Sequence, residues 1–405
     1  MSVDTSVDTV VPAQSTASAT PTAAPRTPAE RLRAAFLRAA PALGVFVAAR
    51  LTGMLLMAVW AWHVDKSPLR LLGQSWDSLW YTRIAAHGYG HVKVFAGGAV
   101  VQDDLAFFPL YPGLIRAVTT VLPLTPGGAG LLVSWTAALA AAWGVFAVVD
   151  RSYGRRAATL TVALWALLPH SIVLSMAYTE PLLVAFSAWS LYAVLTRRWL
   201  LAGSLAALAG LSRPNAVALI AAVVLTAAYE LAKGRQRGWR IWTGAAVAPA
   251  GWAAYVLHVG IQKGDPLGGY FAVQAGWSSR FDFGSGTLKF IKHLVSAPER
   301  FSFPIALVIV AAGVLLCALM AFGMDRRPPL ALLLYTGVLV LITVGGAGFF
   351  ESKPRFLLPA FPLLLPLACA MTKARPRASV LVTVALAGLS MAYGTYLVTV
   401  APMPL

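Results

Sequence analysis

The sequence predicts an all-α membrane protein that crosses the bilayer many times. Of its 405 residues, 59% are hydrophobic and only 12% are charged, whereas a soluble domain has about 25% charged residues. Apolar runs of about 20 residues recur along the chain, and each is long enough to cross a hydrocarbon core about 30 Å thick. Strands of a membrane β-barrel would be shorter and alternating. We therefore expect a polytopic bundle of helices.

The charge distribution predicts the orientation of these helices. The chain has 32 Lys and Arg against 15 Asp and Glu, a net charge of +17. Most basic residues lie in short loops beside apolar runs, which marks cytoplasmic loops and not a nucleic-acid partner. We expect five basic clusters to be cytoplasmic: Arg151/Arg155/Arg156, Arg197/Arg198, Lys233–Arg240, Arg326/Arg327 and Lys373–Arg377.

Between these clusters the chain must cross the membrane twice, which predicts about 11 spans with a cytoplasmic N-terminus and an external C-terminus. The interval 199–231 is barely long enough for two crossings, so one long helix is an alternative there. Residues 107–122 include two prolines and Arg116, and we expect a re-entrant or interfacial helix; if it spans, the count shifts by one. The predicted spans lie near 41–62, 127–149, 157–196 and 199–231 (a hairpin each), 241–260, 304–323, 329–350, 356–372 and 378–400.

The chain is expected to have two parts. Residues 1–40 are rich in Ser, Thr, Ala and Pro, a composition that cannot bury a core, so they predict a disordered cytoplasmic tail. No short apolar segment with a cleavage site opens the chain, so we expect no cleaved signal peptide. Residues 41–405 then form the membrane domain. Cys317 and Cys369 both fall in predicted spans, and they predict neither a disulfide framework nor a metal site.

The predicted topology places most of the unusual charges on the external side. The long first external loop, 63–106, includes Asp77, Asp103 and Asp104. Glu180 and Arg213 lie at the predicted external apices of the two hairpins, and the segment ESKPRF (351–356) is external too. This distribution predicts a substrate site at the external membrane face.

The stretch WDSLWYTRIAAHGYG (76–90) is the strongest candidate for this site. An acid surrounded by large aromatic residues is poorly solvated, which suits a proton-transfer or hydrogen-bonding role for Asp77. Trp76, Trp80 and Tyr81 offer flat aromatic faces that can bind a substrate. The alternative is an interfacial helix with its aromatic residues at headgroup level and its charges in water.

Three further acids are weaker candidates. Asp103 and Asp104 precede AFFPLYP, and such a pair can bind a cation or a substrate hydroxyl, although acidic loops are common. Glu180 begins a helix before Pro181, where a carboxylate can also simply stabilise the helix N-terminus. His87 has no second ligand at metal spacing, so a hydrogen-bonded interfacial histidine is the preferred interpretation. We expect no metal and no cofactor.

Three cations are candidates for binding a phosphate. Arg213 interrupts an apolar stretch in LAGLSRPNAVAL, and Arg355, beside Lys353, opens a span in SKPRFLLPAFPL. An arginine at the membrane edge is costly unless it reaches lipid headgroups or meets an anion. The guanidinium fork suits a bidentate clamp on a phosphate. A lipid-borne phosphate at the external boundary is therefore one interpretation, and snorkelling to headgroups is the other.

The blocks WDSLWYTRIAAHGYG and AFFPLYP together resemble the GPI mannosyltransferase 2 (PIG-V) family of GT-C glycosyltransferases. SMAYTEPLLVAFS, GLSRPNAV and KPRFLLPAFPL also resemble blocks of that family, over roughly residues 45–370. The resemblance implies a GT-C fold and an inverting transfer of mannose from a polyprenyl-phosphate donor to an acceptor hydroxyl. By position, Asp77 matches the acid of the family's catalytic loop. The Ala- and Arg-rich composition suggests a bacterial plasma membrane.

A mechanism follows from these residues. Asp77 can accept the proton of the attacking hydroxyl, and Arg355, with Arg213 or Lys353, can stabilise the leaving phosphate without a metal. The partners would be a polyprenyl-phosphate-linked sugar, membrane lipid, and a glycolipid, glycan or protein acceptor. The alternatives are a lipid or sugar transporter or flippase, which would favour inverted repeats with midplane charges, and a GT-C enzyme that uses another polyprenyl-phosphate sugar.

Overall fold

The computed structural model describes residues 27–94, 101–296 and 302–401. Nearly all of the regular structure in these residues is helical, which confirms the all-α class. The exception is a short antiparallel hairpin in the first long loop, in which Val92 pairs with Asp103 and Val94 with Val101. The hairpin strands are β1 (Val92–Val94) and β2 (Val101–Asp103).

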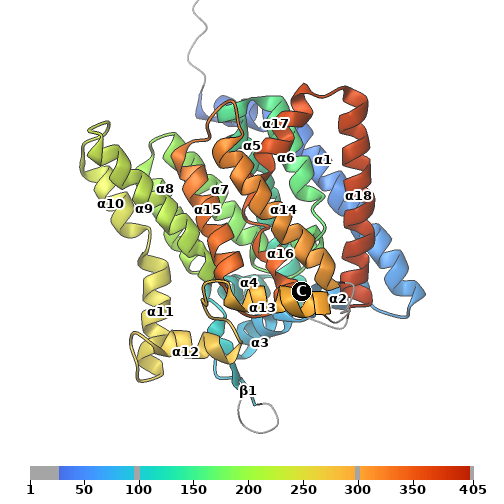
Figure 1. The fold of residues 1–405 in the computed structure, drawn as a ribbon. Helices are drawn as coiled ribbons and strands as arrows, with labels where there is room; N and C mark the ends of the chain where they lie inside the picture. Colours follow the sequence, from blue (N-terminus) through green and yellow to red (C-terminus); the bar gives the residue numbers. More distant parts are fainter. Residues whose placement is uncertain (1–26, 95–100, 297–301, 402–405) are drawn as a thin grey trace, which may run out of the picture. The chain divides into compact units, whose positions relative to one another are not determined.

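The helices of the described residues alternate long spans with short connecting turns (Figure 1). The α-helices are α1 (Pro28–His63), α2 (Pro68–Gly73), α3 (Asp77–His87), α4 (Leu110–Val121), α5 (Pro126–Tyr153), α6 (Arg155–Ala166), α7 (Glu180–Leu195), α8 (Trp199–Gly210), α9 (Val217–Ala232), α10 (Trp239–Val247), α11 (Ala250–Gln262), α12 (Gly269–Gly276), α13 (Ser285–Ser296), α14 (Ser302–Phe322), α15 (Leu330–Gly345), α16 (Lys353–Phe356), α17 (Leu365–Lys373) and α18 (Pro376–Thr399). The 3₁₀ turns are η1 (Asp104–Ala106), η2 (Ser171–Ser175), η3 (Pro214–Ala216), η4 (Phe350–Ser352) and η5 (Phe361–Leu364).

Six helical segments among the described residues are long and apolar enough to cross a membrane, and a bent pair brings the number to seven. The pair joins 350–356 to 361–373 at an angle of 80°. The helices α7, α8 and α15 are apolar but shorter. With α6, each of the roughly 11 predicted spans has a helical counterpart. The chain is therefore a multi-pass integral membrane protein.

The two predicted hairpins are present, but the side chains at their apices are buried. The chain breaks between α8 and α9, so 199–231 is a hairpin and not one long helix. However, α6 and α8 have 12 residues each and rise only about 18 Å. The apices were expected to be external loops, yet Glu180 is 1% and Arg213 8% exposed. Both side chains are therefore enclosed by protein and do not lie in open external loops.

Two other expectations concern segments at the edges of spans. The segment 107–122 forms α4, whose 12 residues are too few to cross a bilayer, as predicted for a re-entrant or interfacial helix. The last part of the expected tail, residues 28–40, is helical, because α1 begins at Pro28; the division of the chain near residue 40 stays a prediction. Thr27 and Glu30 exchange backbone and side-chain hydrogen bonds, a capping box that starts the helix. Residues 1–26 lie outside the described residues.

Small residues allow the central helices to pack at short range. The α5–α7 contact is lined by alanines, and a Cβ on Gly144 would lie 2.8 Å from the Cβ of Ala188. Where α8 crosses α10, a Cβ on Gly203 would lie 2.1 Å from the carbonyl oxygen of Gly244. Contacts of this kind are typical of membrane helices, whose association depends on close packing.

The basic turns gather at one end of the bundle (Figure 1). The Tyr153 hydroxyl donates to the Arg326 carbonyl at 3.3 Å, and Lys373 pairs with Asp325 at 2.5 Å. These contacts join the α5–α6, α14–α15 and α17–α18 turns. The Trp199 indole donates to Gln236 at 2.6 Å and joins the α7–α8 turn to the α9–α10 turn. The five basic clusters thus belong to two groups of linked turns at the same end of the bundle (Figure 1), the arrangement expected of cytoplasmic loops.

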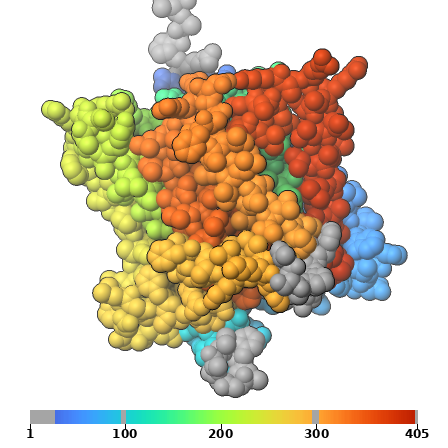
Figure 2. All heavy atoms as spheres, viewed as in Figure 1, coloured from blue at the N-terminus to red at the C-terminus, as the bar shows by residue number. Residues whose placement is uncertain are grey.

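The opposite end of the bundle is covered by short helices. In Figure 1, α2, α3, α4, α12 and α13 lie below the long helices, and Figure 2 shows α12 and α13 as a layer beneath α14 and α15. The layer is fixed to the α15–α16 connection, because the Phe290 ring stacks on Phe350 at 4.1 Å and Thr287 donates to the Val344 carbonyl at 2.8 Å.

The linked basic turns predict the result of a topology experiment. We expect a reporter fused to chains truncated after residue 90 or 270 to give an external signal, and one fused after residue 236 a cytoplasmic signal, because Lys and Arg are retained inside. Paired alkaline phosphatase and fluorescent-protein fusions measure this. A cytoplasmic signal at residue 90 would place the α3 end of the bundle in the cytoplasm and would contradict an external site.

Candidate active site

Asp77 is the first residue of α3, at the end of the bundle opposite the basic turns (Figure 1). The preceding residue, Trp76, has φ 50° and ψ −114°, a conformation that costs a bulky residue about 1–3 kcal/mol. The Asp77 backbone N–H donates to the Tyr178 hydroxyl at 3.4 Å. A strained turn and the start of α3 therefore fix the position of the Asp77 carboxylate.

Arg355 lies against Asp77, with its NH1 nitrogen donating to Oδ2 of Asp77 at 2.8 Å. It belongs to the short helix α16, just before the 80° bend of the span. The side chain is 6% exposed, and its guanidinium lies over the rings of Tyr178 and Phe356 at 5.2 and 5.3 Å. An arginine enclosed in this way does not snorkel to headgroups, and Asp77 is not the isolated acid that the sequence suggested.

Glu180 joins Arg355 to a second arginine. Its Oε1 lies 2.6 Å from NH1 of Arg213 and 3.2 Å from Nε of Arg355. The Glu180 side chain is 1% exposed, so both arginines meet a carboxylate that is almost completely removed from water. Ion pairs in such surroundings are screened much less than pairs in solvent. Glu180 therefore forms an ion pair with both guanidinium groups.

These contacts form a continuous chain of charges: Asp77, Arg355, Glu180 and Arg213. The sequence proposed all four residues for the site, and the structure brings them together from α3, α16, α7 and the α8–α9 turn. Asp77 is 20% exposed, whereas the other three side chains are at most 9% exposed. The cluster thus has one accessible end, which is the Asp77 carboxylate.

Two residues that the sequence interpretation missed line this cluster. Thr179 accepts a hydrogen bond from Arg213 at 3.0 Å and lies 3.3 Å from the Tyr81 hydroxyl. Tyr178 contacts Asp77 and Arg355, as described above. Burial raises the pKa of the Tyr81 hydroxyl above its ordinary value, so Tyr81 stays protonated. Both missed residues directly precede Glu180, and their adjacency to it was the only available signal.

Lys353 lies apart from the chain of charges. Its ammonium donates to the carbonyl oxygens of Thr343 and Gly346, both at 2.6 Å, and lies over the Phe350 ring at 5.9 Å. These contacts fix the connection between α15 and α16. The predicted role of Lys353 in phosphate binding stays a prediction, but its observed contacts are with backbone.

Asp103 and Asp104 also lie apart, in the hairpin loop. Asp103 accepts from the Leu105 backbone N–H at 2.9 Å and pairs with Lys263 at 2.6 Å. Asp104 is fully buried and accepts from the backbone N–H groups of Gly90 and His91 at 2.9–3.1 Å. The two acids thus hold the loop against α11 and the end of α3. Substrate binding by either acid remains a prediction.

The aromatic residues of α3 pack mainly against protein. The Trp80 ring stacks on Phe107 at 5.7 Å and meets the edge of Trp277 at 5.1 Å. Tyr81 is 4% exposed and packs edge-on against Phe107. Trp76 and Trp80 are half-buried, so each retains an accessible part, whereas the Tyr81 ring is enclosed.

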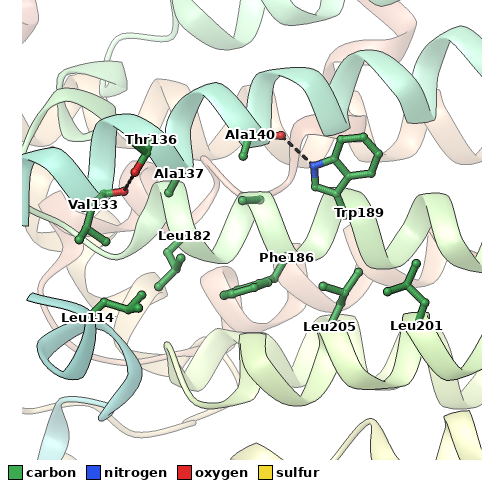
Figure 3. A pocket seen from close by; sticks show the side chains of 11 residues that line it. Leu114, Val133, Thr136, Ala137, Ala140, Leu182, Phe186, Trp189, Leu201 and Leu205 are labelled. Carbon is green, nitrogen blue, oxygen red and sulfur yellow. Dashed lines mark hydrogen bonds between the residues drawn. The ribbon is translucent and has the colours of Figure 1, made fainter. Parts of the chain in front are cut away.

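Two apolar cavities flank the cluster. The larger, about 600 Å³, lies between α4, α5, α7 and α8, and Leu182, on the first turn of α7, is one of its lining residues (Figure 3). The smaller, about 200 Å³, lies between α14, the bent span and the loop before η2. Pro354, Leu357 and Leu358 line it, so it directly adjoins the helix that bears Arg355. Within residues 27–94, 101–296 and 302–401, no group of three His, Cys, Asp or Glu could hold a metal ion.

Comparison with protein families gives one match. A model described as "dolichyl-phosphate-mannose-protein mannosyltransferase" matches residues 109–260, a segment that includes Glu180 and Arg213 but neither Asp77 nor Arg355. No curated protein matches the chain.

Comparison with solved structures shows the fold. The oligosaccharyltransferase of Archaeoglobus fulgidus, in its apo form, has a TM-score of 0.55 at 14% identity, over 90% of this chain and 56% of its own. ArnT from Cupriavidus metallidurans, bound to undecaprenyl phosphate, has a TM-score of 0.53 at 16% identity, over 84% and 61%. The chain thus spans little more than half the length of these proteins. It has the fold of GT-C membrane glycosyltransferases, which confirms the predicted fold.

The burial of Glu180 predicts a large effect on stability. We expect Glu180→Ala to lower the free energy of unfolding by about 3–5 kcal/mol, because it leaves Arg213 and Arg355 buried with one carboxylate fewer. Glu230→Ala is the matched control. The Glu230–Arg235 pair spans 3.5 Å with Arg235 54% exposed, and its loss should cost at most about 1 kcal/mol. Thermal unfolding in detergent compares the two, and equal losses would contradict the role given to Glu180.

Proposed function

We propose that the protein transfers mannose, with inversion, from a polyprenyl-phosphate-mannose donor to an acceptor hydroxyl. It would be a bacterial member of the GPI mannosyltransferase 2 type, with residues 41–405 as its catalytic domain and its site outside the plasma membrane. The single observation on which this rests is the charge chain Asp77–Arg355–Glu180–Arg213. It combines an accessible carboxylate with two buried guanidinium groups at one place, beside apolar cavities.

The two arginines suit the phosphate of the donor. A sugar leaves a polyprenyl-phosphate donor as its phosphate takes up the bonding electrons, so negative charge grows on the phosphate oxygens. Preorganised guanidinium groups in a site that excludes water stabilise this charge strongly. Arg355 and Arg213 are held by Glu180, and neither has to be reoriented when the charge develops. Phosphate leaving groups need no protonation, so no acid is required beside them.

Asp77 suits the role of general base. Its carboxylate is 20% exposed, whereas that of Glu180 is 1% exposed and held between two arginines. Only Asp77 among the four can therefore meet a hydroxyl that enters from outside. In the transfer, the acceptor oxygen bonds to the anomeric carbon, the carbon–oxygen bond to phosphate breaks, and Asp77 takes the hydroxyl proton. Trp76 and Trp80 would line the sugar.

The donor lipid fits the cavity that adjoins Arg355. Pro354 and Leu357 flank Arg355 in the chain and line the cavity of about 200 Å³, so a prenyl chain there would have its phosphate near the guanidinium. Prenyl-phosphate lipids appear in two similar structures: undecaprenyl phosphate in ArnT and dolichol-phosphate in Archaeoglobus fulgidus AglB, which has a TM-score of 0.50 at 13% identity, over 89% of this chain and 56% of its own. The family match at residues 109–260 supports mannose as the sugar. A glycolipid, glycan or protein would supply the acceptor hydroxyl.

Replacement of the base tests the reaction directly. We expect Asp77→Asn to insert and fold but to lower turnover about 10²–10⁴-fold, because a positioned base contributes that much. Transfer of radiolabelled mannose from polyprenyl-phosphate-mannose to membrane acceptors measures it. Asp65→Asn, at an exposed loop position, is the control and should keep full activity. Wild-type turnover by the Asp77 variant would remove Asp77 from the mechanism.

Arg355 should separate donor binding from chemistry. If Arg355 contacts the phosphate equally before and during transfer, Arg355→Ala mainly weakens donor binding. If Arg355 instead stabilises the negative charge that grows on the leaving phosphate, kcat falls about 10²–10³-fold. Arg355→Lys should rescue only part of the loss, because it keeps the charge without the planar fork. Both constants should be measured in a phosphate-free detergent. Arg280→Ala, an exposed arginine, is the control; an Arg355→Ala variant that behaves like it would leave Arg355 without a role in the donor site.

A further inference from the structure

The contact between Asp77 and Arg355 occupies the two groups that the proposed reaction needs free. Oδ2 of Asp77 accepts from NH1 of Arg355 at 2.8 Å. The lone pair of Oδ2 that faces the guanidinium cannot at the same time take a proton from a hydroxyl. Conversely, an N–H that points at a carboxylate does not bind a phosphate oxygen. In the observed arrangement, the contact therefore occupies one oxygen of the base and one nitrogen of the clamp.

The surroundings of Arg355 leave only one of its partners replaceable. Nε faces Glu180 at 3.2 Å, and that carboxylate is 1% exposed and also paired with Arg213. The guanidinium lies over the rings of Tyr178 and Phe356. Asp77 is the remaining partner and the most exposed member of the cluster. An anion that takes the place of the Asp77 carboxylate therefore meets the NH1 nitrogen of Arg355 at the most exposed point of the cluster.

We propose that Asp77 occupies the phosphate position in the empty site, and that the donor phosphate releases it to act as base. This rests on the proposed function. Carboxylate and phosphate oxygens both accept from a guanidinium fork, so one can replace the other on Arg355. Binding of the donor thus creates the base, and a hydroxyl that arrives first meets a carboxylate already engaged. The site stays inactive until the donor is bound, and the order of binding is donor before acceptor.

The exchange changes the charge at Arg355 in a defined way. Asp77 and Glu180 together match Arg355 and Arg213 in the empty site. The phosphodiester of the donor adds one negative charge beside Arg355, while Asp77 moves toward the accessible side. When the acceptor hydroxyl attacks, its proton passes to Asp77, and the bonding electrons pass to the departing phosphate. Arg355 then faces the charge that has formed, and Asp77 is neutral and no longer competes for it.

Binding of a short prenyl phosphate tests the exchange without any transfer step. Farnesyl phosphate is titrated into the purified protein in a maltoside detergent by calorimetry, with farnesol as the ligand that lacks the phosphate. We expect Asp77→Asn to bind farnesyl phosphate about tenfold more tightly than wild type, because the charged competitor is removed. Asp77→Ala, which removes the acceptor atoms altogether, should bind at least as tightly, and farnesol should bind all forms alike.

The control is Asp65→Asn, which removes the same charge from an exposed position where the backbone has φ 54°, a conformation that Asn tolerates. If Asp65→Asn tightens binding as much as Asp77→Asn does, the change in the protein's net charge explains the effect, and the proposed exchange is overturned. Equal binding by wild type and both Asp77 variants also overturns the exchange but leaves the proposed function standing. If no form binds farnesyl phosphate better than farnesol, both the exchange and the proposed phosphate site fail.

Discussion

The site depends on one carboxylate that touches two arginines. Glu180 is enclosed by protein, and its Oε1 lies within 3.2 Å of both Arg213 and Arg355. Without it, two like charges would be buried close together, with only the Asp77 carboxylate left to pair with Arg355. The helices α7 and α16 and the turn after α8 are therefore held at a common point. The position of Asp77 then follows, because its partner Arg355 is already fixed.

The sequence predicts the fold well, because the signals it uses are local. Apolar length locates spans, and basic turns locate their ends, as the linked clusters around Tyr153, Asp325 and Gln236 illustrate. The start of α1 is the exception: composition predicts a tail as far as residue 40, although Thr27 and Glu30 form a capping box. The composition of a 40-residue segment does not reveal a capping box, because the box depends on only two particular residues.

The sequence identifies the charged residues of the site but does not predict which of them contact one another. Asp77, Glu180, Arg213 and Arg355 each stood out as a charge in an apolar setting, which is costly unless it has a partner. Which charges meet depends on contacts between residues far apart, such as Asp77 and Arg355, 278 positions apart. The same limit explains Lys353 and Asp103. Each is an unusual charge in the sequence, yet one binds backbone carbonyls and the other binds Lys263.

The backbone at Trp76 has a consequence for how this protein can change. A conformation that an L-residue adopts only with strain persists because the surrounding packing enforces it. The residue that bears the strain directly precedes the accessible carboxylate, so relief of the strain and displacement of Asp77 are coupled. Substitutions that relax this turn would be expected to make the protein more robust to heat while they loosen its proposed base. Selection for durability and selection for turnover would thus act in opposite directions on the same few atoms.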